Sequence, residues 1–163
     1  MGVAIEREGE KPPVHFSAGV FIEDQLGRLL LLKQEAPEKE YKWGPPAGKS
    51  KANEHPIRTA IRETKEEIGV DVKLENVIGI FENEKTSGIG IVFRAKITRG
   101  TITPQRGEIL EARFFSIGEI EALIRDERLY RPEYNVPAFT NWMKGISSPL
   151  EITNDLANLR RTL

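Results

Sequence analysis

The chain has 163 residues, a net charge of −1 and no cysteine. Its length suits a single domain with a sizeable core. The lack of cysteine excludes disulfides, thiolate catalysis and Cys-ligated zinc, and two histidines are too few for a His-based metal site. The balanced charge gives no basic field for a nucleic-acid polymer, and neither a membrane span nor a signal peptide is evident in the sequence. We therefore expect a cytoplasmic protein.

In chain order, residues 1–13 are charged and contain two prolines, so they are expected to form a flexible arm. A single domain should then occupy residues 14–163. Apolar runs predict strands over residues 14–22 and 28–34, and the turn at 24–27 predicts that they pair as a hairpin.

The second half of the chain alternates further strands with helices. Strands are predicted over residues 71–81, 89–97 and 112–116. A helix capped by Ser116 or Gly118 is expected to run to Ile124, and another, entered through Pro137, should cover residues 136–144. From Gly145 onward we expect a partly packed tail. These elements predict an α+β fold with a mixed sheet.

Between these halves, a loop rich in proline and glycine at residues 43–48 leads into a predicted helix. Asn53 is a favourable N-cap for this helix, and Gly69 is a favourable residue to end it. Residues at helical spacing form a mostly apolar stripe along one face. The stripe consists of Ile57, Ala60, Ile61, Thr64 and Ile68.

Glu63, Glu66 and Glu67 are expected to crowd the helix face turned away from this stripe. Like charges at this spacing repel by roughly 0.2–0.5 kcal/mol per pair. One interpretation is a solvated face whose repulsion is softened by neighbouring basic side chains. The other is a site for a hard divalent cation, Mg²⁺ or Mn²⁺, to which the tight loop could add the carbonyl of Ala47 as a ligand.

The full spacing resembles the Nudix box, the signature of hydrolases that cleave nucleoside diphosphates linked to another moiety. The resemblance covers residues 48–70, and weaker similarity extends over most of the chain. Thr64 departs from the family's usual aliphatic residue, although its methyl group can still pack inward. The matching positions are Gly48, Glu54, Arg62, Glu63, Glu66, Glu67, Gly69 and Val70.

The resemblance implies a Nudix fold, in which a mixed β-sheet is sandwiched between α-helices and the box forms a loop–helix–loop. It also implies Mg²⁺ as the cofactor, with Mn²⁺ as the alternative. Glu66 and Glu67 are the expected principal ligands. Glu63 is expected either to be a ligand or to orient the attacking water.

Other box residues are expected to support this site. Arg62 should hold the glutamates in orientation through charge-assisted hydrogen bonds. Glu54 is expected either to support the loop or to ligate a further metal. Gly48 is expected to be required by its backbone conformation, and Gly69 by the end of the helix.

Many Nudix enzymes use a further carboxylate just before a late strand. Glu108 and Glu111 precede the strand that contains Phe114 and Phe115. Glu108 is the favoured general base or extra ligand, and Glu111 is the alternative.

Four side chains are candidates for substrate binding. Lys33, at the end of the second predicted strand, and Lys49, within the box, are candidates to contact phosphate. Trp43 and Phe81 are candidates to stack on a base or ring, although aromatics beside glycine and proline are more often packed.

We expect hydrolysis of nucleoside di- or triphosphates, or of related pyrophosphate-containing metabolites, by water attack on a phosphoanhydride. Residues 129–132 and 148–152 are loosely similar to a branch of small bacterial phosphatases with such substrates. The alternatives are an ADP-ribose or dinucleoside-polyphosphate pyrophosphatase and a non-catalytic nucleotide-binding Nudix module. Both a monomer and a homodimer are compatible with the sequence.

Overall fold

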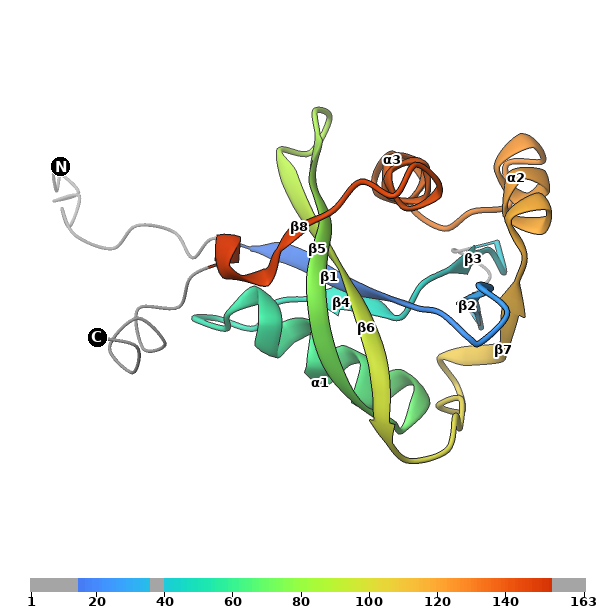
Figure 1. Cartoon of the computed structure of the whole chain (residues 1–163), viewed down its shortest axis with the longest axis horizontal. Helices are drawn as coiled ribbons and strands as arrows, with labels where there is room; N and C mark the ends of the chain where they lie inside the picture. Colours follow the sequence, from blue (N-terminus) through green and yellow to red (C-terminus); the bar gives the residue numbers. More distant parts are fainter. Residues whose placement is uncertain (1–14, 36–39, 154–163) are drawn as a thin grey trace, which may run out of the picture.

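The computed structural model describes residues 15–35 and 40–153 (Figure 1). Within these ranges it contains two β-sheets and three α-helices, as the α+β prediction requires. The five-stranded sheet has the order β4-β1-β6-β5-β8, and the three-stranded sheet has the order β3-β2-β7. The predicted arm at residues 1–13 lies outside the described residues.

The five-stranded sheet lies between α1 on one face and α3 on the other (Figure 1), and α2 follows β7 in the chain. The helices are α1 (Pro56–Ile68), α2 (Ile117–Arg125) and α3 (Pro132–Met143), with a 3-10 turn at Leu150–Thr153. The strands are β1 (Phe16–Ile22), β2 (Leu29–Gln34), β3 (Trp43–Gly44), β4 (Ala47–Lys49), β5 (Asp71–Asn83), β6 (Gly88–Arg99), β7 (Ile109–Phe115) and β8 (Ser148–Pro149).

The predicted hairpin between the first two strands is wrong. β1 pairs in parallel with β6 and antiparallel with β4, whereas β2 pairs with β3 and β7 in the other sheet. The two strands are joined near the turn by an isolated bridge between Glu23 and Leu29. The reason is burial on both faces. Leu30 and Leu32 point into one apolar cluster while Leu29 and Leu31 point into the other, so β2 needs partners as a central strand does.

The box helix begins later than predicted. Its N-cap is His55, whose side chain makes no capping hydrogen bond, and Pro56 is the first helical residue, as the fixed φ of proline allows. Asn53 instead lies in the preceding turn with φ +60°. The predicted end at Gly69 is confirmed, because its φ of 74° closes the helix and its N–H donates to the Lys65 carbonyl.

The predicted orientation of this helix is only partly right. Ala60, Thr64 and Ile68 are buried as expected, but Ile61 is 37% exposed. Glu67 does not face away from the stripe, because it is only 5% exposed and turns toward β4. The main-chain N–H of Ala47 there supplies a donor for the buried carboxylate.

The late helices show one confirmed boundary and one wrong boundary. Ser116 caps α2 in a reciprocal capping box with Glu119. The last helix begins at Pro132 rather than at residue 136, so Pro137 lies inside it. Arg131, at φ 47°, turns the chain into this helix. The tail after Gly145 pairs with β5 through β8.

Candidate active site

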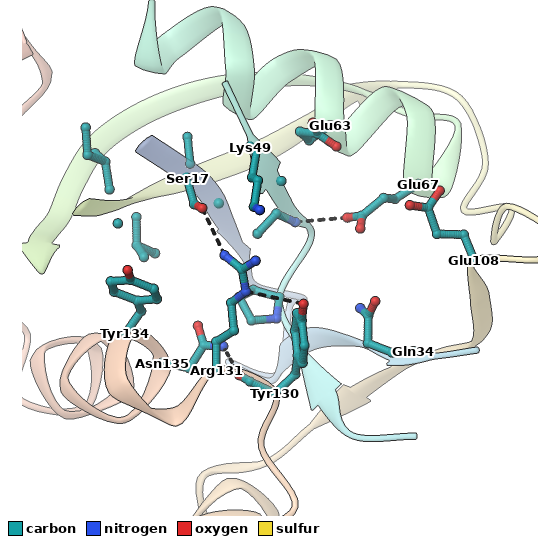
Figure 2. A pocket seen from close by; sticks show the side chains of 18 residues that line it. Ser17, Gln34, Lys49, Glu63, Glu67, Glu108, Tyr130, Arg131, Tyr134 and Asn135 are labelled. Carbon is teal, nitrogen blue, oxygen red and sulfur yellow. Dashed lines mark hydrogen bonds between the residues drawn. The ribbon is translucent and has the colours of Figure 1, made fainter. Parts of the chain in front are cut away.

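A cavity of about 410 Å³ opens between β4, the box helix and the start of α3 (Figure 2). Its volume lies within the range typical of small-molecule sites. Glu63, Glu67 and Glu108 line its acidic side. Lys49 and Arg131 also line the cavity, so it carries both signs of charge. Such a lining can bind a molecule that brings phosphate to a cation-assisted site.

The close contact between β4 and α1 requires a glycine at position 48. A Cβ atom added to Gly48 would lie 2.0 Å from the carboxyl carbon of Glu63, well inside any real contact distance. Gly48 is not among the described glycines with a positive φ, so the left-handed conformation is not what requires a glycine here. The glycine leaves space for the Glu63 carboxylate against the loop.

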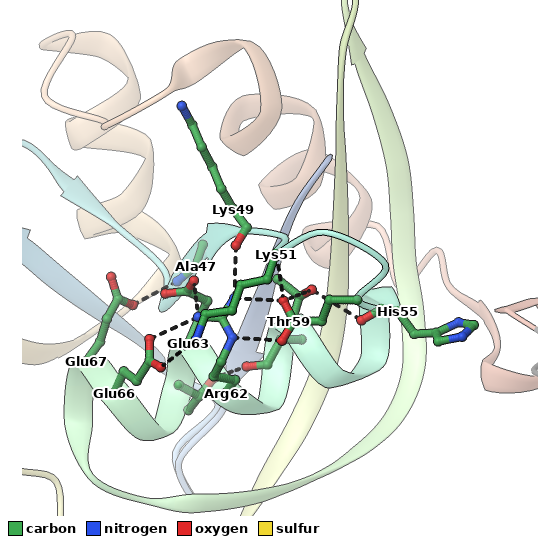
Figure 3. Close-up of polar contacts among 12 residues, drawn as sticks. Ala47, Lys49, Lys51, His55, Thr59, Arg62, Glu63, Glu66 and Glu67 are labelled. Atoms are coloured by element: carbon green, nitrogen blue, oxygen red, sulfur yellow. Dashed lines mark hydrogen bonds and ion pairs between the residues drawn. The ribbon is translucent and has the colours of Figure 1, made fainter. Parts of the chain in front are cut away.

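Arg62 joins three glutamates of the box (Figure 3). Its Nε and Nη2 donate to the two carboxylate oxygens of Glu54 at 2.7 and 2.8 Å. Its Nη1 donates to Glu63 at 2.6 Å and to Glu66 at 2.9 Å, and Nη2 also donates to the Lys49 carbonyl at 2.9 Å. This bidentate, charge-assisted arrangement fixes the loop to the helix.

The pKa values reflect this geometry. The hydrogen bonds that Arg62 donates to Glu54 are the main cause that lowers the pKa of Glu54 to about 2. The same hydrogen bonds are the main cause that raises the pKa of Arg62. Burial raises the pKa of Glu63, and the nearby Glu66 and Glu108 carboxylates add to this effect, although Arg62 opposes it. Burial thus disfavours the ionised form of Glu63 even though Arg62 pairs with it.

Glu67 is held from two directions. Its Oε2 accepts a hydrogen bond from the Ala47 N–H at 2.9 Å, and its main-chain carbonyl accepts from the Gln105 N–H at 2.8 Å. With its amide oriented to satisfy its neighbours, the Gln105 side chain donates to Glu108 at 3.0 Å and to the Glu66 carbonyl at 2.8 Å. The loop before β7 is thereby fixed to the end of α1, which places Glu108 beside the box.

Within residues 15–35 and 40–153, no three acidic or histidine side chains stand together in a metal-ligating arrangement. Mg²⁺, however, is usually held by one or two carboxylates completed by water and substrate phosphate oxygens. Glu63 and Glu67, on one side of a cavity open to substrate, fit that type of site. The buried and crowded carboxylate of Glu63 would gain from a cation there.

The structure brings some of the predicted site residues together. Ala47, Gly48, Lys49, Glu63, Glu67 and Glu108 all line the cavity. Glu66 is half exposed and faces a separate shallow depression on the outer side of α1, together with Glu54 and Arg62. The Ala47 carbonyl stays a predicted ligand, while its N–H holds Glu67.

Four predicted residues lie elsewhere. Trp43 is only 5% exposed and packs edge-to-face on Phe115, so its ring is not free to stack on a base. Lys33 lies over the Trp43 ring, and Glu111 is its partner across the β2–β7 pairing. Phe81 packs beside one apolar cluster. None of these four lines the cavity.

The wall formed by the start of α3 was not among the predicted site residues. The last helix was predicted to begin at residue 136, so the side chains just before and after Pro132 were not considered for the site. The available signal was the group of Tyr130, Arg131, Tyr134 and Asn135 around a proline suited to the first turn of a helix. The missed cavity residues include Ser17, Gln34, Tyr130, Arg131, Tyr134 and Asn135.

The sequence was also compared with known proteins. Residues 13–134 match the family model described as the NUDIX domain. The chain is 30% identical over 96 residues to a MutT-like protein from Streptomyces ambofaciens, covering 58% of this chain and 60% of that relative. The chain therefore spans less than two thirds of the length of this curated relative.

Two solved structures illustrate the likeness in fold. A NUDIX hydrolase from Nitrosomonas europaea is 24% identical with a TM-score of 0.71, over 89% of this chain and 97% of that one. An ADP-ribose pyrophosphatase from Streptococcus suis is 18% identical with a TM-score of 0.65, over 80% and 90% respectively. In the part of this chain that the structure describes, no helix is long and apolar enough to span a membrane.

Proposed function

The chain belongs to the Nudix family, and we propose that it is a divalent-metal-dependent hydrolase of nucleoside di- or triphosphates or related pyrophosphate-containing metabolites. The observation that carries the proposal is the single cavity that holds Glu63, Glu67 and Glu108 together with Lys49 and Arg131. Pyrophosphate hydrolysis needs compensation of phosphate charge and an oriented water molecule. The acidic residues would hold the cation and orient the water, and the basic residues would add to the compensation of phosphate charge.

Glu63 and Glu67 are the residues proposed to hold Mg²⁺, with Mn²⁺ as the alternative. A bound divalent cation would neutralise phosphate oxygens and make a water molecule more acidic. The Ala47 N–H and Arg62 keep the two carboxylates oriented toward the cavity before substrate arrives. Glu66, bound to Arg62 on the outer side, is proposed to tune this arrangement rather than to contact substrate.

Glu108 is proposed as the general base. It lines the cavity and accepts a hydrogen bond from the Gln105 amide, whereas Glu111 does not line this cavity. Its carboxylate would accept a proton from water while the water oxygen bonds to phosphorus. The bond from that phosphorus to the bridging oxygen breaks, and the bridging oxygen leaves with the other product.

The proposal is tested by incubating the protein with Mg²⁺ and a panel of compounds. The panel holds nucleoside di- and triphosphates, ADP-ribose, dinucleoside polyphosphates and thiamine pyrophosphate, and each product is separated by chromatography. Release of phosphate or pyrophosphate from the nucleotides, abolished by EDTA, is the expected result. Cleavage restricted to ADP-ribose or a dinucleotide would change the substrate class. No turnover of any compound, with nucleotide still bound, would instead indicate a non-catalytic binding module.

A further inference from the structure

The part of the cavity formed by the start of α3 is basic, and the proposed function gives its cations only a general part in compensating phosphate charge. Arg131 points into the cavity from the residue before α3, and Lys49 reaches it from β4 (Figure 2). Both side chains also line an adjoining cavity that extends past Ser17 and Tyr134 toward the β5–β6 turn. They therefore lie where the proposed reaction site continues into a second space.

Arg131 is held firmly by neutral partners. Its Nη1 donates to the Ser17 hydroxyl at 3.0 Å, and its Nε donates to the Tyr130 hydroxyl at 3.3 Å. The side-chain amide of Asn135 donates to the Tyr130 carbonyl and so fixes the turn that carries the arginine. Among the described residues, no carboxylate forms an ion pair with either Arg131 or Lys49.

This arrangement differs from that of Arg62, whose guanidinium is surrounded by carboxylates. A guanidinium has five N–H donors, and the hydrogen bonds of Arg131 to Ser17 and Tyr130 use only part of them. The remaining donors of a positioned, partly buried arginine suit a phosphate, which accepts paired hydrogen bonds. The ammonium group of Lys49 in the same cavity would add to the attraction for a phosphate. Without a bound anion, the two positive charges repel each other.

We infer that Arg131, assisted by Lys49, binds a phosphate group of the substrate other than the one that faces Glu63 and Glu67. The term substrate here rests on the proposed function. The consequence is specificity, because compounds with a further phosphate beyond the cleaved linkage gain contacts that shorter compounds lack. Arg131 is thus a specificity-determining residue rather than a participant in bond cleavage.

The test separates anion binding from turnover. Binding of inorganic tripolyphosphate is measured by titration calorimetry in EDTA, so that neither metal nor hydrolysis contributes. Arg131→Gln should weaken binding at least about 10-fold, as expected when a hydrogen-bonded charge is lost. Lys49→Gln should weaken it by roughly 3-fold, because this side chain is exposed.

Two further variants control the experiment. Arg131→Lys keeps the charge but not the paired donors, so its affinity should fall between those of the wild type and Arg131→Gln. Arg99→Gln removes an equal charge from the exposed end of β6 and should bind as the wild type does. Thermal melting followed by circular dichroism establishes that each variant is folded. If Arg131→Gln does not fold, the affinity of Lys49→Gln still tests the inference.

The outcomes also separate this inference from the proposed function. Arg131-dependent binding without any turnover in the substrate panel would support the inference and overturn the hydrolase proposal. Turnover with equal tripolyphosphate affinity in wild type and Arg131→Gln would overturn the inference alone, and would leave stacking of a ring on Arg131 as the better role. Failure of the wild type to bind tripolyphosphate would also overturn it.

Discussion

At the residue scale, the acidic wall of the cavity depends on one arginine. Arg62 binds Glu54, Glu63 and Glu66 at 2.6–2.9 Å. It therefore reduces the repulsion that crowded glutamates on a short stretch of helix would otherwise cause. One guanidinium therefore holds three glutamates in fixed positions, and Glu63 among them lines the cavity.

The pair formed by Glu54 and Arg62 should make the fold sensitive to acid. Because the pKa of Glu54 is lowered from 4.5 to about 2 in the folded state, its stabilising contribution is complete above pH 4.5 and is lost as the pH falls toward 2. Glu54→Gln should lower the free energy of unfolding at pH 7 by about 1–3 kcal/mol. Urea denaturation across pH 2–7 measures this difference.

The difference between the two proteins should shrink as the pH falls toward 2, where Glu54 is protonated in the unfolded state and about half protonated in the folded state. Glu121→Gln, which changes an exposed glutamate on α2, provides the matched control and should follow the wild type. A constant difference between Glu54→Gln and the wild type at all pH values would contradict the assignment.

Gly48 should be needed for activity because of space. A Cβ atom at this position collides with the Glu63 carboxylate, so Gly48→Ala must displace either the loop or the glutamate. We expect a loss of at least about 10-fold in kcat, as for a displaced catalytic group, with a stability cost of about 1–3 kcal/mol. Gly118→Ala is the control, because a Cβ there meets nothing within 4 Å. Equal activity of the two variants would show that Glu63 does not require its observed position.

The identities of the residues allowed some of the site to be predicted. Gly48, Glu63 and Glu67 were predicted together from the spacing of the box, and all three line the cavity. Such a prediction is possible because a helix and the tight loop before it bring residues that are close in sequence together. Choosing Glu108 over Glu111 as the favoured residue agrees with its place in the cavity. Trp43 was placed wrongly, because a side chain beside a loop can equally be buried in a core.

At the scale of elements, local signals fixed the boundaries where capping chemistry is specific. Gly69 ends α1 in the left-handed conformation, and Ser116 and Glu119 form the reciprocal cap of α2. The start of α3 was missed because Pro132 can either interrupt a chain or occupy the first turn of a helix. This ambiguity concealed Arg131 and with it the basic part of the cavity.

The cap of α2 gives a prediction for an element away from the site. Ser116→Ala removes the acceptor for the Glu119 N–H and should lower the free energy of unfolding by about 1 kcal/mol. Activity should stay unchanged, because α2 does not line the cavity. Urea denaturation and initial rates measure the two effects, and Ser147→Ala, an exposed serine outside the helices, is the control. A loss of activity without a loss of stability would show an unexpected link between α2 and the site.

At the scale of the whole molecule, composition and alternation predicted the α+β class but not the pairing of strands. β1 and β2 are adjacent in sequence and separated between two sheets, because each buries residues on both faces. Parallel pairing of β1 with β6 joins residues more than 70 positions apart, and no local turn signal can encode it. The cavity depends on this long-range arrangement, since β1, the box and α3 all contribute to its lining.

The most direct measurement is the Mg²⁺-dependent initial rate of the wild type, Glu67→Gln and Glu121→Gln on the best compound of the panel. Both variants replace a glutamate with glutamine. Glu67 lines the cavity, whereas Glu121 is exposed on α2, away from it. We expect Glu67→Gln to lower kcat at least about 100-fold, because a carboxylate that holds the cation is lost, and Glu121→Gln to retain the wild-type rate. Equal rates for the three folded proteins would contradict the assignment of this cavity as the site of hydrolysis.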